Sequence, residues 1–176
     1  MKWNPERGLG RVKLTVPYAE PTAGVLTEVM GFRQKGQYSS DVKGQPDILV
    51  FETGDGGNGA EIHVEERKDL PRERQGRGGV HHVAFRVDNE EELHQWIQKI
   101  QGAEFPNSGF VDRYYFRSLY FREPNGILFE LATDGPRFGT DEDMAHLGED
   151  LALPPFLESK RDKIEARLKP LDTKEG

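Results

Sequence analysis

The 176-residue chain contains no cysteine, and this absence removes several kinds of chemistry at once. It excludes a disulfide framework, a thiolate metal ligand and a cysteine nucleophile. The chain also lacks an apolar run near the roughly 20 residues that a membrane-spanning helix needs, so we expect no membrane partner. The N-terminal segment MKWNPERGLG has no apolar core of the kind found in signal peptides, which predicts a cytoplasmic protein.

Basic charge is also in short supply. The 24 Lys and Arg residues are outnumbered by 31 Asp and Glu residues, which gives a formal net charge of −7 at pH 7. Because nucleic-acid affinity depends on the neutralisation of phosphates by basic side chains, this balance predicts no nucleic-acid partner. The hydrophobic fraction of 35%, with 10 Phe, is enough for a buried core. A chain of this length forms one ordinary domain or two small modules that share a core.

What the sequence does contain is an internal repeat. Val16 and Val87 end two strand-like segments, Gly31 and Gly102 end the helices that follow, and both pairs are 71 residues apart (87 − 16 and 102 − 31). Three further strand candidates follow each helix: FRQKGQY, DILVFET and AEIHVEE in the first copy, and FPNSGFV, RSLYFRE and GILFELA in the second. The order strand–helix–strand–strand–strand, written βαβββ, therefore occurs twice.

These patterns predict an α+β fold with four parts. Residues 8–67 form a first βαβββ module, residues 68–78 form a charged linker with Pro and Gly, and residues 79–135 form a second βαβββ module. Residues 136–176 form a C-terminal loop and helical tail. We expect the two modules to form a cupped mixed sheet with the helices on its outer side.

The second copy carries a histidine pair and a lone carboxylate. His81 and His82 lie at the start of the strand candidate VHHVAFRV, and Glu130 lies in the otherwise apolar GILFELA. Strand alternation puts His82 on the face away from the helix and His81 on the opposite face. Imidazole and carboxylate from separate strands are typical ligands of a catalytic divalent metal. The residue types alone leave the other interpretation open, in which the histidines are hydrogen-bonded strand residues and Glu130 pairs with an arginine.

Longer stretches of the chain resemble a known family. GGVHHVAFRV, VDRYYFRSLYFREPNGILFELATDGP and DEDMAHLGEDLALPPFLE closely resemble the glyoxalase-like ring-cleaving dioxygenases of the vicinal oxygen chelate superfamily, which is built from βαβββ modules. The similarity extends back through GLGRVKLTVPYAEPTAGVLTEVMGFR and so covers nearly the whole chain. The chain is similar to the C-terminal half of the bacterial branch that cleaves hydroquinones or catechols, whose members usually carry four modules.

The resemblance implies an Fe(II)-dependent, extradiol-type enzyme that acts on a small aromatic substrate and O2, with Mn, Ni or Zn as alternative metals. Carried over by residue, it makes His82 and Glu130 two of three metal ligands. It places His81 beside the ligands and Tyr120 near the ring hydroxyl, where either could relay protons. Arg113 matches an arginine that faces the substrate and would offset the charge of a phenolate.

The third ligand is the point at which this sequence departs from the family. In the family it is a histidine of the first of four modules, and the matching strand position of the first copy here holds Arg11, which cannot bind a cation. Alignment of AEIHVEE with GILFELA places His63 opposite Glu130, so His63 is the internal candidate; an exposed edge histidine is the alternative. His94, on the second helix, and His146, in the acidic tail, have no ligand partner in sequence.

Three other functions stay open at this point. A glyoxalase-type metal-dependent isomerase or lyase needs four protein ligands, and Arg11 counts against it. A non-catalytic small-molecule-binding module with a degenerate metal site agrees with the incomplete ligand set. The chain is also interpretable as the C-terminal half of an enzyme that gains activity only with an N-terminal half. Because modules of this fold pair into cups, we expect a homodimer or pairing with such a half.

Overall fold

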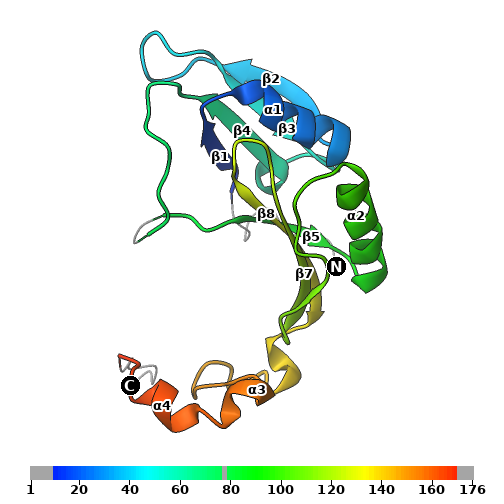
Figure 1. Ribbon diagram of the computed structural model, residues 1–176, viewed down its shortest axis with the longest axis vertical. Helices are drawn as coiled ribbons and strands as arrows, with labels where there is room; N and C mark the ends of the chain where they lie inside the picture. The colour runs from blue at the N-terminus through cyan, green and yellow to red at the C-terminus, as the bar shows by residue number, and fades with distance from the viewer. Residues whose placement is uncertain (1–9, 77–78, 170–176) are drawn as a thin grey trace.

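The computed structural model of the chain describes residues 10–76 and 79–169 and contains two four-stranded sheets (Figure 1). The first sheet has the strand order β1–β4–β3–β2, and the second has the order β5–β8–β7–β6. In both sheets the first strand runs parallel to the last, and the other neighbours are antiparallel. Neither sheet closes into a barrel. The predicted α+β fold with two βαβββ units is therefore confirmed.

The first sheet contains β1 (Val12–Val16), β2 (Arg33–Tyr38), β3 (Ile48–Glu52) and β4 (Glu61–Glu66). Between β1 and β2 the chain forms α1 (Ala19–Gly24), which continues into a π-helical stretch, η1 (Val25–Val29). Pro21 lies in the first turn of α1, where a missing backbone N–H leaves no hydrogen bond unmade. Gly31, with a φ of 74°, adopts the left-handed conformation that ends helices. The 3-10 helix η2 (Asn58–Ala60) leads into β4.

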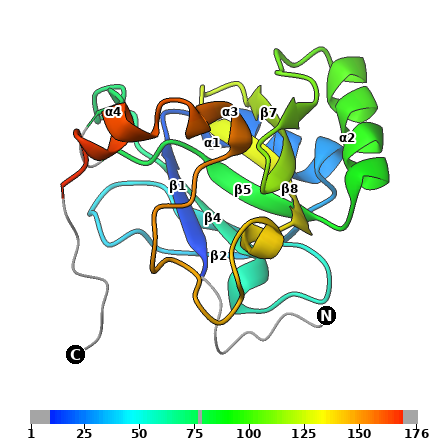
Figure 2. The same ribbon diagram turned by 90° about the horizontal axis from the view of Figure 1, so that it is seen from below.

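The second sheet contains β5 (Val83–Val87), β6 (Val111–Asp112), β7 (Phe116–Arg122) and β8 (Leu128–Pro136). The helix α2 (Glu90–Gly102) contacts β5, β7 and β8 and so covers one face of this sheet (Figures 1 and 2). The apolar residues Leu93, Ile97 and Ile100 recur at helical spacing on one side of α2 and are buried. The opposite face of the sheet is left uncovered by α2.

Two strand boundaries differ from those expected from sequence. β5 begins at Val83, so His81 and His82 precede the strand instead of belonging to it. The weak candidate FPNSGFV forms an irregular segment with one isolated bridge, Asn107 to Phe121, and only the short β6 follows. Pro106 cannot donate to a ladder, and the Asn107 side chain accepts a hydrogen bond from the backbone of Gly109, which favours a turn.

The start of α2 is fixed by a side-chain cap. The Asn89 side chain accepts a hydrogen bond from the Glu92 backbone N–H at 2.9 Å, and the Glu92 carboxylate accepts one from the Asp88 N–H at 2.7 Å. We expect Asn89→Ala to lower the free energy of unfolding by about 1 kcal/mol, because the Glu92 N–H then loses its partner. Urea titration followed by circular dichroism measures this loss, and the exposed Gln98→Ala should stay within about 0.5 kcal/mol. An unchanged midpoint for Asn89→Ala would contradict the cap.

One hydrophobic core joins the two units. Its buried members come from both, and include Leu26, Phe51, Phe121 and Phe129. The rings of Phe32 and Phe85 meet edge to face across the two units, with centroids 5.9 Å apart. Because α1 and η1 contribute to the same cluster as β7 and β8, the units share apolar packing as well as a linker.

A buried polar contact accompanies this packing, which we call the Thr22–Glu123 contact. The Thr22 hydroxyl donates to Glu123 Oε2 at 2.7 Å and accepts from the Asn125 side-chain amide at 2.8 Å. Glu123 Oε1 also accepts a hydrogen bond from the Ile127 N–H at 2.9 Å, and Glu123 is only 2% exposed. The contact therefore anchors α1 to the turn between β7 and β8.

The C-terminal segment contributes little to the core. It contains η3 (Phe138–Thr140), α3 (Pro155–Glu158) and α4 (Arg161–Glu165), and none of the three has a buried residue. Figure 1 shows α3 and α4 at the end of the molecule opposite the first sheet. Within the described ranges, no helix has the length and apolar character needed to cross a membrane.

Candidate active site

Three of the predicted site residues converge on the face of the second sheet that α2 leaves uncovered. The pairing of β8 with β5 and β7 places Ala84 and Tyr120 on either side of Glu130. Residues paired in this way share a face, and His82 lies two positions before Ala84. His82 Nε2 lies 2.7 Å from Glu130 Oε2, and the Tyr120 hydroxyl donates to Glu130 Oε1. A histidine, a carboxylate and a phenol thus meet around one point.

Glu130 and His82 differ in how far they are buried. Glu130 is 3% exposed, whereas the His82 side chain is 34% exposed. A buried carboxylate is costly unless it is paired, and here both oxygens have partners. His82, just before β5, and Glu130, within β8, bring Nε2 and Oε2 to the same place, and both atoms offer lone pairs once Nε2 gives up its proton. This donor pair fits two ligands of a divalent metal ion that remains reachable from outside.

His81 joins the cluster, although strand alternation predicted that it would point away. Its Nδ1 lies 2.9 Å from Nδ1 of His82, and the two rings are perpendicular. Side-chain alternation applies only within a strand. Because β5 begins after His82, at Val83, the two histidines do not have to point to opposite faces of the sheet. Since Glu130 accepts from His82 Nε2–H, His82 Nδ1 is the acceptor and His81 Nδ1–H the donor in this arrangement. A proton-bearing nitrogen of His81 is therefore held against His82.

Arg113 reaches the same cluster from a tight turn between β6 and β7. Its Nε donates to the Tyr120 hydroxyl oxygen at 3.3 Å, and its guanidinium lies over the Tyr120 ring at 5.0 Å. The Asp112 carboxylate holds the turn, because it accepts from the Tyr114 N–H at 2.7 Å and pairs with Arg117 at 2.9 Å. Tyr114 has a φ of 69°, a conformation that non-glycine residues rarely adopt. The supporting roles of Asp112 and Arg117 were not predicted from the sequence. The one sequence signal for them is that Asp112 is an aspartate at the start of a turn.

His63 is not brought to this cluster. It lies on β4, a central strand of the first sheet, and is 3% exposed, so the interpretation as an exposed edge histidine is wrong. Its Nδ1 is 3.0 Å from the Tyr38 hydroxyl and its Nε2 is 3.3 Å from Glu61 Oε2. Among residues 10–76 and 79–169, no three His, Asp or Glu side chains gather in a geometry that could hold a metal ion. The role of His63 as third ligand stays a prediction.

Ion pairs lie on the face of the first sheet that carries His63. Lys13 Nζ lies 2.9 Å from Glu65 Oε2, and this hydrogen bond is the main cause that lowers the pKa of the buried Glu65 carboxyl below its usual range. Lys35 Nζ lies 2.8 Å from Glu61 Oε1 and 3.0 Å from Glu52 Oε2. It lowers the pKa values of both carboxyls by donating to them.

The Glu65 pair predicts a specific pH dependence. Because the folded pKa is lower than the unfolded value of about 4.3, Glu65 stabilises the fold above about pH 4.3 and loses this contribution as pH falls through the folded pKa. We expect Glu65→Gln to lower the melting temperature at pH 7, with a smaller difference from wild type at pH 3. Calorimetric melts at both pH values test this, with the exposed Glu28→Gln as control. Equal differences at pH 7 and pH 3 would contradict the prediction.

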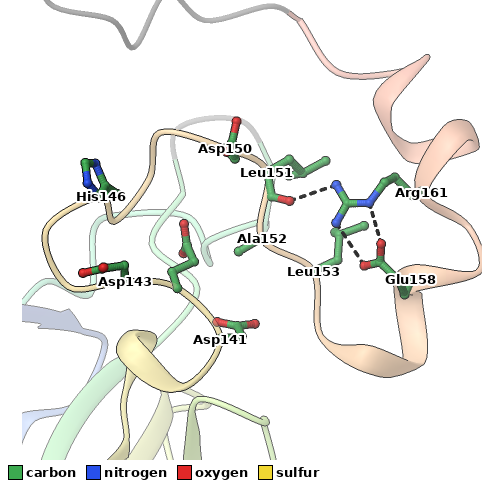
Figure 3. Close-up of a pocket in the computed structure, with 10 residues that line it drawn as sticks. Asp141, Asp143, His146, Asp150, Leu151, Ala152, Leu153, Glu158 and Arg161 are labelled. Carbon is green, nitrogen blue, oxygen red and sulfur yellow. Dashed lines mark hydrogen bonds and ion pairs between the residues drawn. The ribbon is translucent and has the colours of Figure 1, made fainter.

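A separate cavity of about 420 Å³ lies in the C-terminal segment (Figure 3). Its polar lining is mainly acidic and comprises Asp141, Glu142, Asp143, His146, Asp150, Glu158 and Arg161. Arg161 pairs with Glu158 at 2.6 Å and donates to the Leu151 carbonyl at 2.9 Å, as the dashed lines in Figure 3 show. The Tyr115 hydroxyl donates to Asp141 at 2.9 Å, and burial, with this bond, raises the pKa of Tyr115 to about 12. None of the predicted site residues lines this cavity.

Comparison with known proteins gives a consistent result. Residues 8–131 match the family described as the Glyoxalase/Bleomycin resistance protein/Dioxygenase superfamily. The provisionally named ring-cleaving dioxygenase MhqA of Bacillus subtilis (strain 168) is 59% identical over 165 residues, which are 94% of this chain and 52% of MhqA. The chlorohydroquinone/hydroquinone 1,2-dioxygenase of Sphingobium indicum is 29% identical over 121 residues, which are 65% of this chain and 36% of that enzyme.

A solved structure supports the same relationship. The crystal structure of a provisionally described dioxygenase from Bacillus subtilis subsp. subtilis str. 168 aligns with 96% of this chain and 52% of its own length. The alignment has a TM-score of 0.82 at 33% sequence identity. The chain thus spans about half the length, or less, of these relatives.

Proposed function

The chain belongs to the glyoxalase/bleomycin resistance protein/dioxygenase superfamily, and from this membership we propose that it forms part of a ring-cleaving, extradiol-type dioxygenase. The observation that carries the proposal is the cluster of His82, Glu130 and Tyr120 on the uncovered face of the second sheet. The names of MhqA and of the chlorohydroquinone/hydroquinone 1,2-dioxygenase support the reaction type, and the second name favours hydroquinone-like or catechol-like substrates.

In this proposal His82 Nε2 and the Glu130 carboxylate hold a divalent metal, with Fe(II) preferred over Mn, Ni or Zn. When bound, Fe(II) supplies the one-electron chemistry and open coordination positions that reactions with O2 require. The chain's part is to present one neutral and one anionic ligand, of which the carboxylate is nearly inaccessible to bulk water.

Three other side chains act on the substrate. The guanidinium of Arg113 stabilises the negative charge of a phenolate, since it already lies against the Tyr120 oxygen. The Tyr120 hydroxyl, held between Arg113 and Glu130, holds a proton beside the substrate hydroxyl. With Nε2 given to the metal, His82 would carry its proton on Nδ1 and donate to His81 Nδ1. The Nε2–H of the exposed His81 would then exchange protons with solvent or substrate, as a general acid–base requires.

We infer that the third ligand comes from a second two-module unit, either another copy of this chain in a homodimer or an N-terminal half. Three facts support this inference: β5 is an edge strand, the face that carries Glu130 is not covered by α2, and the relatives are about twice as long as this chain. His63 is the internal alternative. A His63→Ala variant that keeps wild-type metal affinity would show that His63 is not a metal ligand.

Oxygen consumption tests the proposal directly. We expect protein loaded anaerobically with Fe(II) to consume O2 with methylhydroquinone or catechol and to release a ring-opened product, detected by mass spectrometry. His94→Ala, on α2, should behave as wild type. Protein that holds metal at full occupancy, alone and with an added N-terminal half of MhqA, but consumes no O2 would contradict the dioxygenase proposal.

A non-catalytic binding module is the second candidate, because the described residues supply only two convergent ligands. Failure to retain any divalent metal, together with saturable binding of a hydroquinone, would favour it. Formation of a ring-opened product would exclude it.

A further inference from the structure

The first sheet has its own cavity at the place that corresponds to the candidate active site. Val12 pairs with Ile62 in the first sheet as Val83 pairs with Phe129 in the second, so β1 and β5 differ by 71 positions and β4 and β8 by 67 (83 − 12 and 129 − 62). These offsets match Arg11 to His82 and His63 to Glu130. The cavity, of about 400 Å³, is lined by Arg11, Lys35, Gly36, Gln37, Tyr38, Val50, Glu61 and His63.

The buried histidine of this cavity already has partners at both ring nitrogens. The Tyr38 hydroxyl lies 3.0 Å from Nδ1, and Glu61 Oε2 lies 3.3 Å from Nε2. The two rings also meet edge to face, with centroids 5.4 Å apart. Since Glu61 accepts from Nε2–H, Nδ1 accepts from the Tyr38 hydroxyl. His63 therefore orients Tyr38 within the cavity wall.

The carboxylates near the cavity are also paired. Glu61 and Glu52 are both bonded to Lys35, and Arg33 Nη2 lies 2.8 Å from Glu52 Oε1. Two cations and two carboxylates thus offset one another along β2, β3 and β4. Whatever charge the cavity presents to a ligand comes from outside this group.

Arg11 supplies that charge. It lines the cavity, and no hydrogen bond or ion pair joins its guanidinium to another side chain in the described parts of the chain. A guanidinium has five N–H donors in a planar fork that matches a carboxylate. Val50 and the Tyr38 ring add apolar surface beside it. The position that supplies the metal-binding imidazole in the second sheet thus holds a fixed cation in the first.

From this arrangement we propose that the cavity on the first sheet binds a small organic carboxylate with an apolar body. The carboxylate pairs with Arg11, and the apolar body lies against Val50 and Tyr38. The cavity does not hold a metal, because Arg11, which cannot bind a cation, stands where His82 stands in the second sheet. The site is distinct from the candidate dioxygenase centre and independent of its activity.

Titration with benzoate in the presence of EDTA, followed by amide NMR shifts, tests the proposal. We expect saturable shifts at residues of β1, β2 and β4, and Arg11→Ala should weaken binding roughly ten- to hundred-fold because a charge-assisted contact is lost. Arg122→Ala removes the same charge from the second sheet and should bind as wild type. Circular dichroism confirms that both variants are folded.

Two further variants separate this site from the dioxygenase centre. His82→Ala should keep benzoate affinity unchanged even though it removes a proposed metal ligand. Absence of saturable shifts, equal affinity in Arg11→Ala, or loss of binding in His82→Ala would overturn the proposal. It would also be overturned if a His82→Ala, Glu130→Gln double variant still bound Co(II) and lost it on addition of His63→Ala.

Discussion

Glu130→Gln is expected to lower the affinity of the protein for a divalent metal by about 100-fold or more and to remove ring cleavage with it. The amide keeps the size of the side chain and can still accept a hydrogen bond from Tyr120, so the neighbouring side chains can keep their positions. What is lost is the negative charge, and loss of even an outer partner of a metal ligand typically costs 10–100-fold. Isothermal titration with Mn(II) or anaerobic Fe(II) measures the affinity, and oxygen uptake measures the activity.

A matched control separates the charge at this position from charge in general. Glu91→Gln removes one carboxylate from the exposed first turn of α2 and should leave metal affinity unchanged. The variant Glu130→Gln should also fold in EDTA, since the amide oxygen can still accept from Tyr120 and the amide N–H can donate to His82 Nε2 once His82 carries its proton on Nδ1. If Glu130→Gln bound metal as tightly as wild type, Glu130 would not be a ligand.

Thr22→Val is expected to lower the free energy of unfolding by about 1–3 kcal/mol, although it changes one hydroxyl to a methyl group. The buried Glu123 Oε2 loses its donor, whereas the partly buried Asn125 amide keeps its hydrogen bond to the Tyr18 carbonyl. Urea unfolding followed by tryptophan fluorescence measures the loss.

Thr27→Val is the control for this prediction. The Thr27 hydroxyl bonds only to carbonyls one turn earlier on an exposed face, so its loss should stay within about 0.5 kcal/mol. If the two variants were equally stable, the Thr22–Glu123 contact would not be what anchors α1 to the β7–β8 turn. A second, earlier transition in Thr22→Val would show that the two units then unfold separately.

The topology was predictable because the sequence repeats one unit twice. Val16 and Val87 end corresponding strands, and the same offset of 71 residues relates β1 to β5 in the structure. The apolar spacing of α2 and the cap at Asn89 are local features as well. Such features depend on neighbours within one turn or one strand, which a sequence displays directly.

Features that depend on distant contacts were not predictable. The pairing of Thr22 with Glu123 joins residues 101 positions apart, and nothing in either local sequence indicates it. β5 starts at Val83 because its pairing with β8 begins there. This starting point decides whether strand alternation separates His81 from His82 or leaves their rings in contact. The placement of Arg113 depends on the left-handed conformation of Tyr114, which propensities for tyrosine do not favour.

The edge positions of β1 and β5 have a practical consequence for handling the protein. Each leaves a row of backbone N–H and C=O groups that an extended peptide can join, and such rows template aggregation when no partner fills them. β1 carries Lys13 on its exposed side, whereas β5 relies on Arg86 amid Val83, Phe85 and Val87. We therefore expect β5, which has fewer polar side chains than β1, to be the edge of this pair that is more open to pairing with another chain.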